Sequence, residues 1–348
     1  MKIRGRQLGL QFGGTPGRYN AITDVAGVEV GTVTLIEGDH IRTGVTAILP
    51  RGRAKAHIPC AAGSFSFNGN GEMTGLAWIE EAGELQTPIT ITNTASCGVT
   101  RDATLQWLVK HKIGTGQDWG LPVAAETYDG DLNDINGFHV TAAHTIQALD
   151  NARGGEVELG SVGGGTGMIT YDFKAGNGTA SRLVEIDGEQ FTLGIFVQSN
   201  FGRREDFAVL GVPVGQNILH DKLRGKEQGS IIAIIATDAP LQAHQLKRLA
   251  RRVPLGLART GTVGGNSSGD IFLAFSTGNE NSFRGPRRTA DYIANSSIDG
   301  LFRAVVEATE EAVLDSMICN ETMIGRNGAK SIALPHDELM NLMKRYGR

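Results

Sequence analysis

The sequence predicts a mixed α/β fold, and three observations support this prediction. Apolar runs of strand length, such as Ile231–Thr237 (IIAIIAT), are bounded by polar or glycine-containing segments. Segments with the apolar spacing of a helix, such as Leu301–Met317, alternate with these runs. Glycine is abundant, with 48 of 348 residues, which indicates many tight turns. No repeat or low-complexity linker divides the chain, so we treat residues 1–348 as a single domain.

The first half of the chain is expected to contain three strands and three helices. Apolar runs between glycine or proline residues predict strands at Val28–Val33, Val45–Leu49 and Ile89–Thr92. Helical spacing predicts helices at Leu76–Ala82, Thr100–His111 and Val140–Leu149. Two segments rich in glycine or polar residues, Gly63–Gly75 and 114–120, are interpreted as loops.

The second half is expected to continue the alternation. Strands are predicted at Phe191–Val197, Ile231–Thr237 and Ile271–Phe275, with the second buried on both faces. Helices are predicted at Leu241–Arg252, Leu301–Met317 and Pro335–Tyr346, and 220–229 is interpreted as an exposed loop. The basic residues of the first of these helices are interpreted as a solvated face.

Composition excludes several classes of function. The net charge of -4 does not favour binding to nucleic acid or to an anionic membrane. There is no apolar segment of about 18 residues and no signal-peptide pattern, so we expect a soluble, cytoplasmic protein. The three cysteines have no metal or redox spacing, and we expect no metal or cofactor. The acidic segment Asp129–Gly137 lacks the spacing of a calcium loop and is interpreted as a solvated turn.

A glycine-rich turn directly before a buried strand is the main candidate for chemistry. In Gly261–Phe275 (GTVGGNSSGDIFLAF) small residues precede the run Ile271–Phe275. Three interpretations are open for this turn: a plain connection between strands, an anion-binding nest, or a tight turn that presents a nucleophile. Asp270 follows the last glycine where a phosphate loop has lysine, and its charge would repel phosphate. We therefore favour Ser268 as a nucleophile.

The surrounding blocks resemble the DmpA-type aminopeptidases, which form peptidase family S58 and include the β-peptidyl aminopeptidases. The resemblance covers nearly the whole chain in the order of the family. It is carried by SSGDIFLAFST with the preceding IIATDAPLQAHQLKRLARR, and by Asn20–Gly31, Arg42–Pro50, Glu126–Val140, Gly160–Arg182 and Val197–Arg204. The resemblance implies self-cleavage before a serine, followed by catalysis with that serine as the new N-terminal residue.

On this reading Ser268 attacks the carbonyl group of Ser267, and hydrolysis of the resulting ester separates chains 1–267 and 268–348. The new α-amine of Ser268, with a reference pKa of about 7.7–8.0, would serve as the base. Asp270 would either orient this amine or cap the turn. Ser267 stands where many relatives have glycine, and its side chain would slow the cleavage.

The resemblance also implies partners for the nucleophile. Thr309 and Glu311 match a hydroxyl residue and a glutamate placed two positions apart on a helix, with Glu310 and Glu307 as rivals. Two such residues do not share a helix face, so they would have to flank the site from different sides. Asn200 matches the side-chain donor to the oxyanion.

Glu126 resembles the carboxylate that binds the free amino group of the substrate. No role is transferred to His139, which stands near a tyrosine of some relatives, and Tyr171 is an alternative for that tyrosine.

The fold implied by the resemblance is a four-layer αββα sandwich that resembles N-terminal-nucleophile hydrolases. The implied activity is release of N-terminal residues from short peptides, amides or esters by a homotetramer of the cleaved pair. Two other readings stay open. The fold is shared with ornithine acetyltransferases, which transfer acyl groups but use threonine, and an uncleaved binding protein could retain the same fold.

Overall fold

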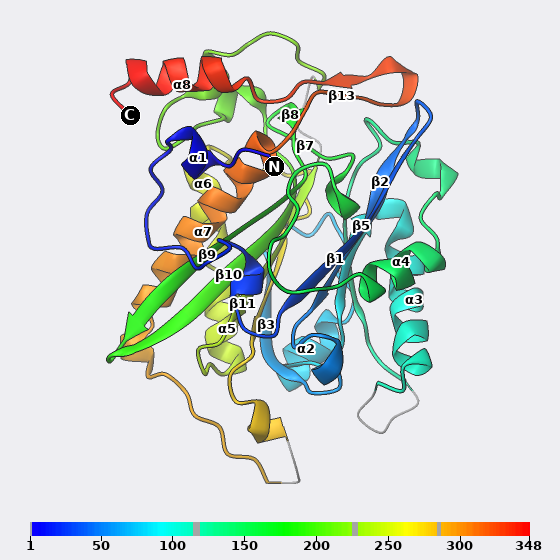
Figure 1. Ribbon diagram of the computed structural model, residues 1–348, viewed down its shortest axis with the longest axis vertical. Helices are drawn as coiled ribbons and strands as arrows, with labels where there is room; N and C mark the ends of the chain where they lie inside the picture. Colours follow the sequence, from blue (N-terminus) through cyan, green and yellow to red (C-terminus); the bar gives the residue numbers. More distant parts are fainter. Residues whose placement is uncertain (1, 114–118, 225–228, 284–286) are drawn as a thin grey trace.

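Two β-sheets form the centre of the molecule. The computed structural model describes residues 2–113, 119–224, 229–283 and 287–348 (Figure 1). A four-stranded sheet has the order β1-β2-β5-β6, and a six-stranded sheet has the order β4-β3-β12-β11-β10-β9. The strands of the first sheet are β1 (Glu29–Glu37), β2 (Ile41–Leu49), β5 (Ile89–Asn93) and β6 (Val123–Thr127). Those of the second are β3 (Cys60–Ser66), β4 (Glu84–Leu85), β9 (Asn177–Ile186), β10 (Glu189–Asn200), β11 (Ser230–Thr237) and β12 (Ile271–Ser276).

Helices cover the outer face of each sheet, so the molecule has four layers (Figure 1). Helices α3 (Cys97–Lys110) and α4 (Ala142–Asp150) pack on the four-stranded sheet. Helices α5 (Ala243–Ala250) and α7 (Asp299–Ile318) pack on the six-stranded sheet, and α6 (Val253–Arg259) packs against α7. The remaining elements are α1 (Gly5–Leu8), α2 (Leu76–Ala82), α8 (His336–Arg345) and the short hairpins β7 (Ile169–Thr170) with β8 (Phe173–Lys174) and β13 (Met323–Ile324) with β14 (Lys330–Ser331).

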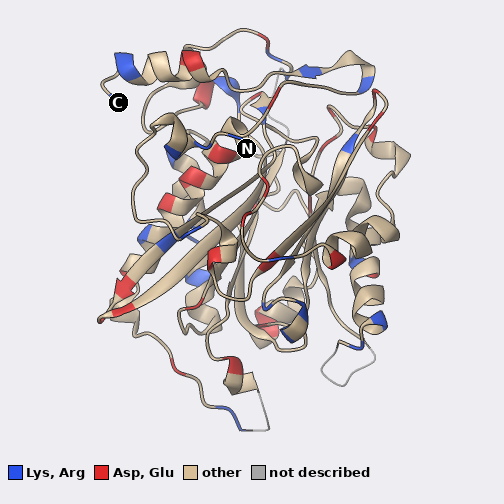
Figure 2. Ribbon diagram, in the orientation of Figure 1, with Lys and Arg blue, Asp and Glu red and all other residues tan. Residues whose placement is uncertain are grey.

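Strands β11 and β12 lie in the middle of the larger sheet because both of their faces are apolar. Alternate residues point to opposite faces of a strand. Ile231, Ala233 and Ile235 therefore join the core under the helices, while Ile232 and Ile234 join the core between the two sheets. Neither strand carries a charged residue, and the charged residues lie mainly on helices and loops (Figure 2). The two strands pair in parallel, so both begin at the same edge of the sheet.

Close packing between α7 and the sheet depends on a glycine. A Cβ atom added at Gly178 of β9 would lie 1.9 Å from the carbonyl oxygen of Ala312, so only glycine lets the helix approach this strand. The four-layer arrangement of the αββα sandwich predicted from the resemblance is confirmed by these contacts.

Most of the expected elements are present, and the exceptions have physical reasons. Helix α2 has the predicted bounds, and the other predicted strands and helices are found within a few residues. The interpretation of Gly63–Gly75 as a loop is wrong at its beginning, because Gly63–Ser66 belong to β3. Gly63 faces the backbone of α5, which explains a glycine inside a strand. Strands β6 and β9 and helix α6 were not predicted, and the loops expected around 114–118 and 225–228 lie outside the described residues. No helix in the described ranges is both long and apolar enough to cross a membrane.

Candidate active site

The site lies where β11 and β12 begin. In the parallel register Ile232 pairs with Ile271, which brings Ser230 beside Gly269. The amide of Gly269 donates a hydrogen bond to Oγ of Ser230 at 3.2 Å, and the amide of Ile231 donates to Oδ1 of Asp270 at 3.2 Å. The glycine-rich turn is therefore attached directly to the first residues of the neighbouring strand.

Ser268, the predicted nucleophile, is buried and hydrogen-bonded within the turn. Its Oγ donates to Oδ1 of Asp270 at 2.5 Å, and Nδ2 of Asn68 donates to Oδ2 of the same carboxylate at 3.0 Å. Burial raises the pKa of Asp270, although these two hydrogen bonds oppose the shift. The proton of Ser268 is thus directed at a carboxylate, and its oxygen is left able to accept a proton from another group.

Asn200, the predicted oxyanion donor, ends β10 directly opposite Ser230. Its Oδ1 accepts the backbone N–H of Ile169 at 2.9 Å, an assignment that only the oxygen of the amide can satisfy. Its Nδ2 is buried and has no hydrogen-bond partner among the residues that the structure describes. A buried donor without a partner costs free energy. This N–H group is therefore available to a ligand or to a reacting carbonyl group.

Gly229 lies next to this unpaired donor. A Cβ atom at Gly229 would lie 3.1 Å from Nδ2 of Asn200 and 1.7 Å from the backbone carbonyl oxygen of Asn200. Only glycine fits this position. The peptide bond between Gly229 and Ser230 is therefore held beside Asn200.

Glu126, predicted to bind the amine of the substrate, is buried in β6. Its Oε1 accepts the amide of Glu72 at 2.9 Å and its Oε2 accepts the hydroxyl of Thr94. Burial raises the pKa of Glu126. A Cβ atom at Gly71 would lie 3.2 Å from Oε1 of Glu126 and 3.0 Å from Cα of Gly269, so Gly71 separates this carboxylate from the turn.

A cavity of about 850 Å³ lies between Glu126 and the glycine-rich turn. Its walls come from both sheets and include Ser230, Ser267 and Glu126 but not Ser268. The full lining is Gly69, Asn70, Gly71, Glu72, Thr94, Glu126, Tyr128, Gly229, Ser230 and Ser267. The cavity can hold a small ligand with a cationic group at Glu126 and a carbonyl group at Ser230.

Thr309 and Glu311 lie on α7, as predicted, but their hydrogen bonds go elsewhere. Oγ1 of Thr309 donates to the carbonyl of Val305 in its own helix, and its side chain packs against Gly256. Glu311 is fully buried and binds three groups, in each case at 2.6–2.9 Å: the guanidinium groups of Arg6 and Arg182, and the amide of Asn20. No hydrogen bond or ion pair among the described residues joins either side chain to Ser268.

The two rival glutamates also have partners away from the turn. Glu310 pairs with Arg259 at 3.1 Å, and Glu307 lies 3.8 Å from Arg182. A hydroxyl and a carboxylate two positions apart also occur at Ser268 and Asp270, which are hydrogen-bonded to each other. Residues at this spacing share a face in extended chain but not in a helix.

Three further residues singled out in the sequence lie in structural roles. Asp129 is fully buried, so the solvated turn predicted there is wrong at this residue; burial raises its pKa to about 6, and Asn93 and Asn133 donate to it. His139 lies 3.3 Å from Asp134, and the hydroxyl of Tyr171 is bonded to Thr260. The described residues contain no group of three or more His, Cys, Asp or Glu side chains that could hold a metal ion.

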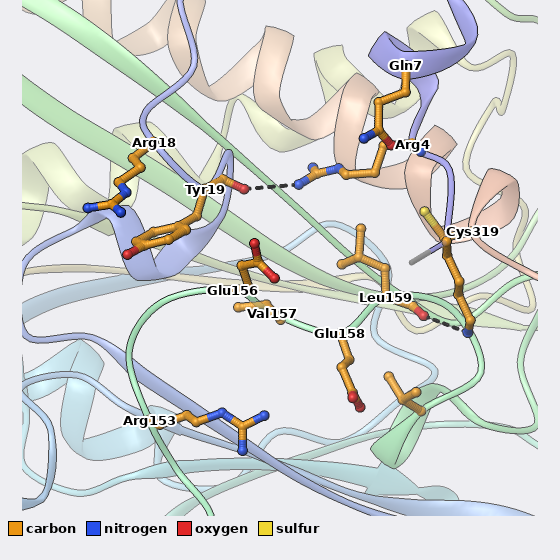
Figure 3. Close-up of a pocket in the computed structure, with 12 residues that line it drawn as sticks. Arg4, Gln7, Arg18, Tyr19, Arg153, Glu156, Val157, Glu158, Leu159 and Cys319 are labelled. Atoms are coloured by element: carbon orange, nitrogen blue, oxygen red, sulfur yellow. Dashed lines mark hydrogen bonds between the residues drawn. The ribbon is translucent and has the colours of Figure 1, made fainter.

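A second cavity, of about 680 Å³, lies near the N-terminus (Figure 3). It shares no lining residue with the first cavity. Its charged side chains have both signs: Lys2, Arg4, Arg18, Arg153, Glu156 and Glu158. The guanidinium group of Arg4 is already bonded to Asp315 and to the carbonyl of Tyr19, so we assign no chemistry to this cavity.

The sequence interpretation missed Ser230 and Tyr128. Ser230 follows a glycine and precedes the run IIAIIAT, which is the same pattern of small residues before a buried strand that selected Ser268. Tyr128 stands two residues after Glu126 and lines the same cavity. The missing information was the pairing of β10 with β11, which places Asn200 opposite Ser230.

Comparisons with known proteins identify the family of the chain. Residues 20–331 match the sequence profile of Peptidase family S58. The chain is 47% identical to beta-peptidyl aminopeptidase BapA of Sphingosinicella microcystinivorans, over 99% of this chain and 93% of the relative. It is 42% identical to a protein of the same name from Sphingosinicella xenopeptidilytica, over 98% and 91%.

Two solved structures have the same fold over nearly their whole length. The L-aminopeptidase D-Ala-esterase/amidase of Ochrobactrum anthropi, described as a variant of the Ntn hydrolase fold, superposes with a TM-score of 0.93 at 46% identity, covering 99% of each chain. A beta-aminopeptidase of Burkholderia sp. gives the same TM-score, identity and coverage.

Proposed function

The chain belongs to peptidase family S58, and from this premise we propose that it cuts itself between Gly229 and Ser230 and then works as an aminopeptidase with Ser230 as nucleophile. Membership of the family makes the protein a peptide-bond hydrolase of the N-terminal-nucleophile type. The observation that carries the choice of serine is the unpaired Nδ2 of Asn200, which lies beside Gly229 and opposite Ser230.

Self-cleavage would begin with attack by Oγ of Ser230 on the carbonyl carbon of Gly229. The hydroxyl proton passes to Oγ of Ser268, whose own proton moves to Asp270. The tetrahedral oxyanion accepts a hydrogen bond from Nδ2 of Asn200. The C–N bond then breaks, and the proton held by Asp270 returns through Ser268 to the nitrogen of Ser230. An ester now joins Gly229 to Oγ of Ser230. Water hydrolyses this ester, which leaves a carboxylate on Gly229 and a free α-amine on Ser230.

The cleaved enzyme would repeat the same steps on a substrate. The α-amine of Ser230, with a reference pKa of about 7.7–8.0, takes the proton of its own hydroxyl. The substrate places its ammonium group at Glu126 and its first carbonyl group at Ser230, in the cavity that both residues line. A blocked amino terminus would leave the buried carboxylate of Glu126 without a cation, so we propose selectivity for free N-terminal residues of short peptides, amides or esters.

Cleavage between Ser267 and Ser268 is the second candidate, because Nδ2 of Asn70 donates to the carbonyl oxygen of Ser267 at 2.7 Å. In that reading Ser268 is the nucleophile and chains 1–267 and 268–348 result. The roles predicted for Thr309 and Glu311 stay predictions. A homotetramer of the cleaved pair and a cytoplasmic location, both expected from the sequence, are also proposals, and size-exclusion chromatography with light scattering tests the first.

Intact mass under denaturing conditions separates the two cleavage sites. Dividing 37.0 kDa in proportion to chain length, a cut at Gly229–Ser230 yields chains of about 24 and 13 kDa, whereas a cut at Ser267–Ser268 yields about 28 and 9 kDa. N-terminal sequencing of the small chain should read SIIAIIAT. A small chain that begins SGDIF would support the second candidate, and a chain that stays intact and inactive would contradict both.

A further inference from the structure

The amide group of Asn200 is held by two donors on its oxygen side. Oδ1 accepts the backbone N–H of Ile169 at 2.9 Å and Nη2 of Arg224 at 3.0 Å. An amide oxygen has two lone pairs, and both are used. The nitrogen is therefore fixed on the opposite side, where it has no partner within the described ranges.

Arg224 is itself anchored at two other points. Its Nε donates to Oδ2 of Asp131 at 2.7 Å, and its Nη1 donates to the carbonyl oxygen of Ile169 at 3.2 Å. The side chain is 6% exposed, so it is held by protein groups more than by water. One guanidinium group thus ties together the acidic turn at Asp131, strand β7 and the end of β10.

We propose that Arg224 is a positioning residue for the reaction: it orients and polarises the amide of Asn200 so that Nδ2 is ready to donate to the oxyanion. This inference rests on the proposed function, because it assigns Arg224 a task only if Asn200 stabilises the intermediate. It adds a residue, together with its partner Asp131, that the sequence interpretation did not include.

The physical reasons are geometry and charge. A donor stabilises an oxyanion only if it is already aimed at the position where the charge develops. With Ile169 alone the amide keeps one bond and can rotate about it, whereas two donors leave a single orientation. A hydrogen bond from a cation also draws electron density from the amide, which makes its N–H groups stronger donors.

A double-mutant cycle tests the proposal. The variants are Arg224→Met, Asn200→Ala and the combination, each followed by the rate of self-cleavage from intact mass and by kcat and KM for alanine p-nitroanilide. Loss of an oxyanion donor lowers kcat by about 10²–10³-fold. We expect Arg224→Met to lower kcat and the cleavage rate roughly 10-fold with little change in KM, and to have almost no further effect when Asn200 is already alanine.

Two control variants separate positioning from folding. Arg224→Lys keeps a positively charged N–H donor on a flexible side chain, and it should recover part of the rate that Arg224→Met loses. Asp131→Asn removes the ion pair but leaves the bond between Arg224 and Asn200, so its rate should fall less than that of Arg224→Met, while thermal unfolding reports any loss of stability.

Several results would overturn the proposal. An equal loss from Arg224→Met in both backgrounds, or a change in KM alone, would show that Arg224 does not act through Asn200. A crystal structure of Arg224→Met gives a readout independent of rate, and an unmoved Asn200 side chain with unchanged cleavage would also count against it. If Asn200→Ala cleaves and turns over at the wild-type rate, the assignment of the oxyanion donor itself fails, which is a different failure from that of Arg224.

Discussion

Ser230 and Ser268 stand at the same edge of one sheet, yet their surroundings differ. Ser230 begins β11, lines the cavity and lies opposite Asn200. Ser268 precedes β12, is absent from the cavity lining and already donates its proton to Asp270. The first serine has a place for an oxyanion beside it, and the second has a proton acceptor.

On the proposed mechanism the two serines are complementary parts of one site. Attack on a carbonyl group needs a nucleophile next to an oxyanion donor, and it also needs a base. In that mechanism the turn with Ser268 and Asp270 would supply the base for self-cleavage, and the amide of Gly269 links the turn to Ser230. The glycine-rich turn is important to the chemistry even though the proposed bond to be cut lies on the neighbouring strand.

The largest expected effect is that of Ser230→Ala. Without this hydroxyl there is no nucleophile, so we expect no cleavage between residues 229 and 230 and no measurable aminopeptidase activity. Intact mass and an assay with alanine p-nitroanilide provide the measurements. A Ser230→Ala protein that still separates into two chains, or still turns over substrate, would reverse the roles of the two serines.

Ser268→Ala should have the next largest effect. It removes the group that takes the proton from Ser230, and such acid–base assistance contributes about 10²–10⁴-fold. We expect self-cleavage slowed by this order but still at Gly229–Ser230, and a smaller fall in kcat, because the α-amine of Ser230 is the proposed base in the cleaved enzyme. Ser276→Ala is the matched control, since it removes a buried hydroxyl at the far end of β12 that donates to the carbonyl of Ala239 and accepts from the amide of Gly278. Complete loss of cleavage in Ser268→Ala, with Ser230→Ala still cleaving, would contradict the comparison.

Glu126→Gln should lower kcat/KM for substrates with a free amino group by about 10–100-fold, because a charge-assisted hydrogen bond is lost. Activity on an N-acetylated substrate, low in both proteins, should change little. In the wild type, burial raises the pKa of Glu126. On acidification kcat/KM should therefore begin to fall at a pH higher than the pKa of an exposed glutamate. Glu310→Gln is the control, because burial also raises the pKa of Glu310 but that side chain pairs with Arg259 outside the cavity. Equal losses in the two variants would remove the role given to Glu126.

The smallest effect concerns stability. Because the pKa of Glu126 is raised on folding, the folded chain binds the proton more readily than the unfolded chain. The free energy of unfolding contributed by this group therefore decreases as pH rises from the ordinary glutamate pKa of 4.5 through the raised pKa of Glu126. Urea unfolding across this window should show a weaker decrease for Glu126→Gln than for wild type. A steeper decrease in the variant would mean that the carboxylate stabilises the fold.

Local patterns predicted most of the fold, and pairing between distant strands was what they could not supply. The alternation of apolar runs placed α2 and β11 closely, since burial on one or both faces is written in the local sequence. The interpretation of Gly63–Ser66 as loop was wrong because Gly63 obscures the strand pattern of β3. A glycine stands there because the backbone of α5 approaches the strand closely.

Pairing between distant strands also determines which candidate residues meet in the site. Asn200, Glu126 and the turn at Ser268 were selected from the sequence, and the structure places all three near Gly229, Ser230 or Gly71. The roles of Thr309 and Glu311 stay predictions, and the hydrogen bonds of these two side chains go to groups other than Ser268. Ser230 was overlooked because its distinction from Ser268 depends on Asn200, 30 positions away, and on the antiparallel register of β10 with β11.

The order of strands in the larger sheet has a consequence for refolding. A cut before Ser230 would leave β11 and β12 in one chain, inserted between β3 and β10 of the other. The pieces could not separate without breaking the middle of the sheet, so the mature enzyme would persist as a pair. Once denatured, however, the two pieces would have to find each other in solution, and recovery would depend on their concentration. The uncut chain would thus be needed once, as the template for its own assembly, and unfolding after maturation would be close to a one-way event.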